Sequence, residues 1–195
     1  MQTTRGQRLR NILLRRYIAR QPVPVWIPKH KGVIHHNLLN SLMAFWPLDE
    51  ASGTRKDAHS TNHLSDNGTV TQAAGKVGNA GQFTALNTEY LNILDNPALS
   101  TGDIDFCWAG WVYADSFGAD RMIVTKATAV PNREYTVWFD VAANRFQFRI
   151  FDGTNNVGTA VANSLGAPST GTWYFIVAWH NSVANTVNIS VNNGD

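Results

Sequence analysis

Several features that commonly identify a protein class are scarce in this sequence. Its 195 residues include one cysteine, Cys107, so an internal disulfide and a cysteine-based zinc site are excluded. Charged residues make up 15% of the chain, against roughly 25% in an average soluble domain. No apolar run approaches the ~20 residues that a membrane-spanning helix needs. We therefore expect no membrane span, and we expect Cys107, which lies in an apolar segment, to be a packing residue.

Catalytic signatures are scarce as well. The nucleophile pattern Gly-x-Ser-x-Gly and the phosphate-binding pattern Gly-x-x-x-x-Gly-Lys-Thr do not occur. The best carboxylate pair for glycoside hydrolysis is Asp103 and Asp105, and no third acid follows before Asp115. We interpret Asp103 and Asp105 as turn residues that open a strand. The sequence therefore predicts a protein that is not an enzyme and has no catalytic residue.

Positive charge is concentrated at the N-terminus. Residues 1–40 contain eight Arg and Lys and no Asp or Glu, whereas the rest of the chain contains eight basic and all 14 acidic residues. Apolar residues within 6–20 recur at the spacing of one face of a short helix, and the prolines of 21–28 favour an extended path. The sequence thus predicts a basic N-terminal arm and linker over 1–40, part extended and part short helix, followed by a body over 41–195.

Three interpretations of the arm compete: a solvated terminus, a docking arm and an organelle transit peptide. We favour docking, because the arm has too many apolar residues for a simple linker and Trp26 lies among prolines that suit a protein groove. We expect residues 1–35 to bind other protein subunits of an assembly, with nucleic acid as the alternative partner because arginines neutralise phosphates. The expected contact residues are Arg8, Leu9, Arg10, Leu13, Arg15, Arg16, Tyr17 and Trp26.

The body has the pattern of an all-β protein. Residues 145–150 and 186–191 alternate apolar and polar side chains, which places Arg145, Gln147 and Arg149 in water. Apolar runs over 104–114 and 172–179 suit strands covered on both faces. Further strands are expected over 41–46, 81–84, 90–94, 121–126 and 134–140. The expected core residues are Phe45, Phe83, Leu91, Phe106, Trp108, Trp111, Phe146, Phe148, Phe175 and Val177.

An ordered series of motifs runs along the body. It comprises the segment from Leu42 to Thr54, Arg55-Lys56-Asp57 with Asn62 and Leu64, Gly75 to Phe83, Tyr90 to Ile93, Leu99 to Phe106, Ala109 to Val112, Arg133-Glu134-Tyr135 and Gly171 to Phe175. This series resembles laminin-G-like jelly-roll domains of the concanavalin A-like lectin/glucanase superfamily, in particular the variants found in phage and other virion proteins. The resemblance covers residues 41–195 and implies a two-sheet antiparallel jelly-roll sandwich. Relatives continue past the position of Asp195 with closing strands, so we expect either a fragment or a sheet that a neighbouring molecule completes.

The resemblance also implies where a ligand binds. Some relatives hold calcium at a sheet rim, and Asp57, in an oxygen-rich loop with Asn62 and Asp66, is the matching metal ligand here. The alternative is an Asx-turn in which Asp57 only caps the loop. Aromatic side chains stack on sugars in lectins. Trp138 alternates with the apolar residues Val137 and Phe139, so it is an aromatic residue that could face solvent.

These observations lead to one expected function. The chain is expected to be a non-enzymatic structural or adhesion component of a larger assembly, a virion. The arm would anchor it, and the lectin-like domain would bind glycans or a host surface. The alternatives are a free carbohydrate-binding lectin module, located outside the cell or at its surface, and a glycoside hydrolase of the same superfamily.

Overall fold

The computed structural model describes residues 41–127 and 129–194, and its strands confirm an all-β body. The predicted arm of residues 1–40 lies outside the described residues. The chain divides into two compact units, one ending at Ala98 and one beginning at Leu99. Each unit is described by itself below.

The first unit contains short strands joined by long loops. They are β1 (Ser65–Asn67), β2 (Thr71–Ala74), β3 (Asn79–Gln82) and β4 (Tyr90–Asn92), with the 3₁₀ helices η2 (Ala85–Asn87) and η3 (Pro97–Leu99). Strand β1 pairs with β4 and β2 pairs with β3, both antiparallel. The strand expected over 41–46 does not form, because the backbone at Phe45 bonds to the Asp57 carboxylate and to Ala58 instead of to a partner strand.

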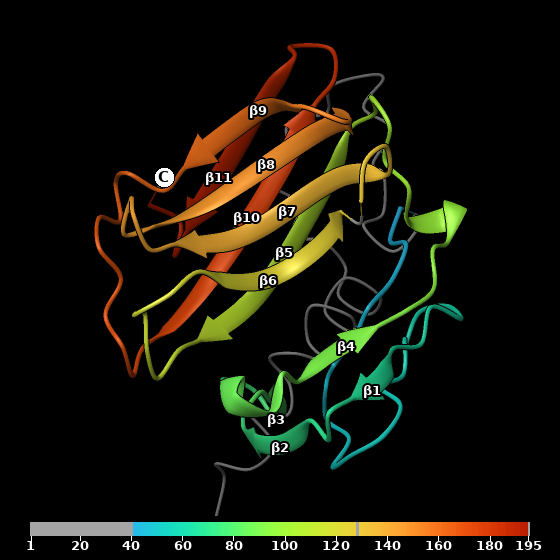
Figure 1. Ribbon diagram of the computed structural model, residues 1–195, viewed down its shortest axis with the longest axis vertical. Helices are drawn as coiled ribbons and strands as arrows, with labels where there is room; N and C mark the ends of the chain where they lie inside the picture. The colour runs from blue at the N-terminus through green and yellow to red at the C-terminus, as the bar shows by residue number, and fades with distance from the viewer. Residues whose placement is uncertain (1–40, 128, 195) are drawn as a thin grey trace, which may run out of the picture. The chain divides into compact units, whose positions relative to one another are not determined.

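The second unit consists of two antiparallel sheets (Figure 1). One sheet has the order β11–β10–β5 and the other has the order β6–β7–β8–β9. The strands are β5 (Phe106–Tyr113), β6 (Arg121–Ala127), β7 (Arg133–Asp140), β8 (Arg145–Gly153), β9 (Asn156–Val161), β10 (Trp173–Asn181) and β11 (Thr186–Val191). The strands expected over 121–126, 134–140, 145–150 and 186–191 are therefore confirmed.

The core of the second unit lies between the two sheets. Buried side chains of β7 and β8 pack against buried side chains of β10 and β11, so the unit is a two-layer sandwich. Aromatic rings contribute edge-to-face contacts, with 5.8 Å between the centroids of Phe106 and Phe148 and 5.4 Å between those of Phe146 and Tyr174. The main core residues are Val137, Phe139, Phe146, Phe148, Ile150, Tyr174, Ile176, Ala178, Ile189 and Val191.

Part of the expected core was wrong. In β10 the buried residues are Tyr174, Ile176, Ala178 and His180, which lie on the face opposite to the expected Phe175. Trp111 is 40% exposed and its ring lies 5.1 Å from that of Phe175. A continuous apolar run has no alternation, so it cannot indicate which face of the strand turns inward.

The remaining corrections to the core concern three further residues. Phe83 is 49% exposed, although we expected it in the core. Val177 is half-buried and lies on the same outward face of β10 as Phe175. Cys107 is exposed on the outer face of β5, where we had expected a packed thiol.

Candidate functional site

The predicted metal ligand Asp57 is held by four protein donors. Its side chain is buried, and its Oδ1 accepts hydrogen bonds from the amides of Phe45 (2.9 Å) and His59 (2.8 Å). Its Oδ2 accepts from Ser60 Oγ (2.8 Å) and from the Asn62 amide (3.2 Å). Burial alone would raise the pKa of Asp57, but these hydrogen bonds hold that pKa far below its usual value.

This geometry has a consequence for calcium. An ion at Asp57 would have to compete with four donors for the lone pairs of the carboxylate. No group of three or more His, Cys, Asp and Glu side chains in the described part of the chain is arranged to hold a metal ion. The contacts of Asp57 are those of a loop cap, and calcium binding at this residue stays a prediction.

The neighbouring motif residues also bond to one another. Asn62 is buried, donates through Nδ2 to the Met43 carbonyl (3.0 Å), and accepts from Trp46 Nε1 at its backbone oxygen (2.6 Å). Asn96 Nδ2 donates to Asn62 Oδ1 (2.5 Å). Asn62 thus ties three separated stretches of the first unit together.

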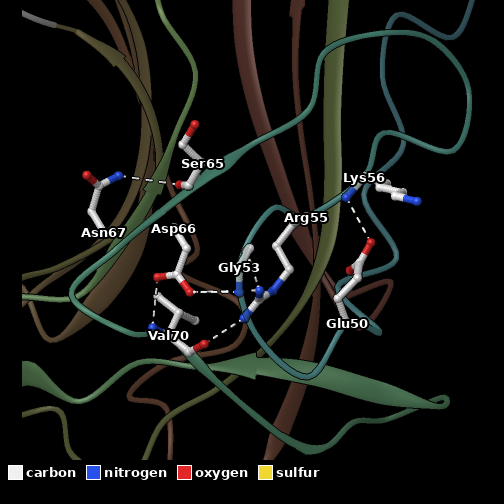
Figure 2. Close-up of polar contacts among 8 residues, drawn as sticks. All are labelled: Glu50, Gly53, Arg55, Lys56, Ser65, Asp66, Asn67 and Val70. Atoms are coloured by element: carbon white, nitrogen blue, oxygen red, sulfur yellow. Dashed lines mark hydrogen bonds and ion pairs between the residues drawn. The ribbon is translucent and has the colours of Figure 1, made fainter.

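Arg55 is the centre of a second network of hydrogen bonds within the first unit (Figure 2). Its side chain is fully buried, and its guanidinium donates to the carbonyls of Gly53 and Val70, the latter at 2.7 Å. Asp66 lies 3.9 Å from Arg55 Nη1 and accepts from the amides of Gly53 (3.1 Å) and Val70 (2.9 Å). The motif residues Arg55, Asp57, Asn62 and Asp66 are therefore occupied in holding loops together.

A different set of polar residues lies on the outer face of the sheet β6–β9. Trp138 of β7 is paired with Gln147 of β8, and Asp140 is paired with Arg145. Arg149 lies two residues beyond Gln147 in β8, on the same face of the sheet. These positions alternate with the core residues of both strands, so their side chains leave the sheet on the side away from the core. We call Trp138, Asp140, Arg145, Gln147 and Arg149 the polar cluster.

Direct contacts connect four members of the polar cluster. Gln147 Nε2 donates to Asp140 Oδ2 (2.9 Å), and Arg149 Nη2 donates to Gln147 Oε1 (3.1 Å) and lies 3.8 Å from Asp140 Oδ2. The Arg149 guanidinium also lies over the Trp138 ring, with Cζ 4.4 Å from the ring centroid. Gln147, which we expected in water, is 4% exposed because these neighbours enclose its amide.

Several N–H groups of the polar cluster make no hydrogen bond. Trp138 Nε1, Arg145 Nε and Arg149 Nε are buried atoms without a hydrogen-bond partner. Each acceptor oxygen already accepts one hydrogen bond: Asp140 Oδ1 accepts from the Ala143 amide (3.0 Å), while Asp140 Oδ2 and Gln147 Oε1 accept within the cluster. These three N–H groups are out of reach of a ligand, so the partly exposed guanidinium of Arg149 is the donor that a ligand could contact.

Apolar and hydroxyl side chains flank the polar cluster on the same face. Met122 of β6 is paired with Trp138 and is 60% exposed. On the other side, β9 pairs Val161 with Gln147 and exposed Thr159 with Arg149. The candidate site is therefore a polar surface that crosses four strands, with apolar contacts at its borders.

An open hollow lies near the sheet edges at β9 and β11. Its walls include Trp179, Asn188 and Asn163 but contain no charged side chain. It offers fewer fixed polar groups than the polar cluster, so we place the candidate site on the outer face of β6–β9.

Sequence reasoning found the members of the polar cluster only one at a time. Arg145, Gln147 and Arg149 were predicted to point outward, and Trp138 was noted as a residue that could face solvent. The pairing register of β7 with β8, which brings them together, was missed. The signal was present, because two alternating segments are separated only by 141–144, the length of a hairpin loop.

The predicted arm residues Arg8, Leu9, Arg10, Leu13, Arg15, Arg16, Tyr17 and Trp26 lie outside the described residues. Within the described part of the chain, no helix is both long enough and apolar enough to cross a membrane. Comparisons of this chain with protein-family models, with curated proteins and with solved structures returned no match.

Proposed function

We propose that this chain is a non-enzymatic glycan-binding protein that uses the polar cluster as its binding surface. The observation that carries this proposal is the connected set Trp138, Asp140, Gln147 and Arg149 on an outward sheet face. Planar amide, carboxylate and guanidinium groups can each make paired hydrogen bonds to neighbouring hydroxyl groups of a sugar ring. Met122 and Val161 would contact the apolar C–H surfaces of that ring.

The fixed positions of these side chains support a binding role. Ordering a long side chain upon association costs about 0.5–1.5 kcal/mol. Gln147 and Arg149 already hold each other and Asp140 in the free protein, so binding would meet little of this cost. A surface that crosses several strands also suits an extended chain of sugars better than a single small molecule.

The spacing of carboxylates on β7 argues against hydrolysis. Asp140 and Glu134 project from the same strand six residues apart, which is roughly 20 Å at the rise of a strand. Glycoside hydrolases place their two carboxyl groups within about 10 Å of each other. Glu134 is further occupied by Lys126 and by the Thr101 amide (2.7 Å).

The sequence supports a wider role for the same surface. The concentration of positive charge in residues 1–40 supports an arm that anchors the protein in an assembly. We propose that this assembly is a virion, and that the second unit carries the polar cluster toward a glycan of a host surface. A free lectin module would use the polar cluster in the same way without an assembly.

Binding to immobilised glycans tests the proposal. The full chain is screened on an array of neutral and acidic glycans, and the best ligand is then titrated by calorimetry. Asp140→Ala should weaken that binding at least tenfold, because Gln147 and Arg149 lose their shared partner. The matched control is Asp115→Ala, which removes an exposed acid outside the polar cluster.

Two results would contradict the proposal. One is a correctly folded full chain that binds no glycan on the array. The other is equal binding by the Asp140→Ala and Asp115→Ala variants. Release of reducing sugar from the bound glycan would instead support the hydrolase alternative.

A further inference from the structure

We infer that the ligand of the polar cluster is an anionic glycan, and that Arg149 binds its negatively charged group. This inference rests on the proposed function and specifies the class of sugar. The shared chemistry is an anionic oxygen on a pyranose chain, supplied by a uronate carboxylate or by a sulfate ester.

The formal charge of the polar cluster is positive. Arg145 and Arg149 face a single carboxylate, that of Asp140. The next acid along β7, Glu134, is neutralised by its ion pair with Lys126. One guanidinium charge on this face is therefore not balanced by a carboxylate of the cluster, and a negatively charged ligand would balance it.

The geometry of Arg149 leaves one side of its guanidinium available. Nη2 is directed to Gln147 Oε1 and toward Asp140, and the plane of the group lies over Trp138. Nη1 makes no hydrogen bond to any residue that the structure describes, and the side chain is 31% exposed. Arg149 is thus held in place by three neighbours, while Nη1 has no acceptor among the described residues.

The charge of the polar cluster favours an anionic sugar over a neutral one. Both oxygens of Asp140 and the side-chain oxygen of Gln147 already accept hydrogen bonds, whereas Nη1 of the partly exposed Arg149 donates to no residue that the structure describes. A hydroxyl group can share the lone pairs that remain on these oxygens, but it carries no charge that would balance the second guanidinium. A carboxylate or sulfate brings acceptors only, and its hydrogen bonds to a guanidinium are roughly twice as strong as neutral ones.

Matched pairs of polysaccharides test the inference with the full chain. Polygalacturonate is compared with its fully methyl-esterified form, and dextran sulfate is compared with dextran, by affinity electrophoresis at physiological salt. We expect retention by a charged polymer that exceeds retention by its neutral counterpart at least tenfold. The charged polymer that is retained identifies the group as a carboxylate or a sulfate.

Residues 1–40 are basic and would also attract polyanions, so the variants must separate the two contributions. Arg149→Gln should reduce the retention at least tenfold, whereas Arg121→Gln, which removes the same charge from β6, should leave it within twofold. Thr159→Glu is a second variant on an exposed position: it places a negative charge beside Arg149 in the register of β9 and should also abolish the retention. This variant decides the question if Arg149→Gln does not fold.

The outcomes distinguish this inference from the proposed function. Equal binding of charged and neutral polymers, weakened by Asp140→Ala, would overturn the anionic ligand and leave glycan binding intact. Equal effects of Arg149→Gln and Arg121→Gln, with no effect of Thr159→Glu, would assign the retention to general charge and overturn the inference. The absence of binding to every glycan would overturn the proposed function itself.

Discussion

The substitution Asp57→Asn tests how the first unit is held together. Asparagine keeps one oxygen for the amides of Phe45 and His59 but directs an NH₂ group at the donors of Ser60 and Asn62. Two hydrogen bonds to a charged acceptor are lost, each worth about 1.5–3 kcal/mol. The Ser60 hydroxyl can turn to accept from the new amide, which offsets part of the loss. We therefore expect a decrease of roughly 2–4 kcal/mol in the free energy of unfolding.

The same carboxylate predicts a dependence of stability on pH. The pKa of Asp57 is lowered in the folded protein, so its contribution is fully present above the unfolded value near 4. As the pH falls below about 4, the unfolded chain takes up a proton that the folded carboxylate does not, and the contribution decreases. The wild-type protein should therefore lose stability in acid, and the difference between wild type and Asp57→Asn should shrink there.

Hydrogen exchange of the full chain, measured by mass spectrometry at pH 7 and in urea, reports this loss. Peptides covering 43–62 should exchange faster in Asp57→Asn than in the control Asp115→Asn, with or without calcium. If chelation of calcium destabilised the wild type as much as the substitution does, Asp57 would be a metal ligand and the reasoning from capping would be refuted.

Three further predictions concern packing and the arm. Phe148→Ala should cost roughly 3–5 kcal/mol in urea unfolding, because Phe148 is fully buried between the sheets; an unchanged midpoint would contradict the described core. Gly158→Ala should destabilise the second unit by about 1–3 kcal/mol, because a Cβ at this position would overlap Val187 Cγ2. The control Gly118→Ala should melt like the wild type, because its Cβ would meet only the hydroxyl of Ser116 at 3.5 Å. Deletion of residues 1–35 should prevent incorporation into the assembly while the circular dichroism of the body stays unchanged, and normal incorporation would refute a docking arm.

The strands of the second unit could be predicted from sequence because their patterns are local. Residues 145–150 and 186–191 alternate, and alternation fixes both the strand and the inward face. In β10 every position from Trp173 to Trp179 is apolar, so the strand was predicted and its buried face was not. Tyr174 and Ile176 face inward because the other sheet packs against that side of β10, and the local sequence of β10 does not indicate that side.

The first unit and the polar cluster were less predictable for a related reason. The segment 41–46 has the composition of a strand, yet its backbone partner is the side chain of Asp57, twelve residues from Phe45. The polar cluster needs the register of β7 against β8, and register follows from turn geometry and core packing together. Contacts between side chains on neighbouring strands can be identified only once the register of those strands is known.

The exposed thiol of Cys107 offers a practical use of the sandwich. It is the one cysteine of the chain, and it lies on the outer face of β5, whereas the polar cluster lies on the outer face of the opposite sheet. A maleimide linker on a sensor chip would therefore attach the native protein at a single defined atom. The polar cluster would then point away from the chip toward the dissolved glycan, so its affinity could be measured on a uniformly oriented layer without any engineered residue.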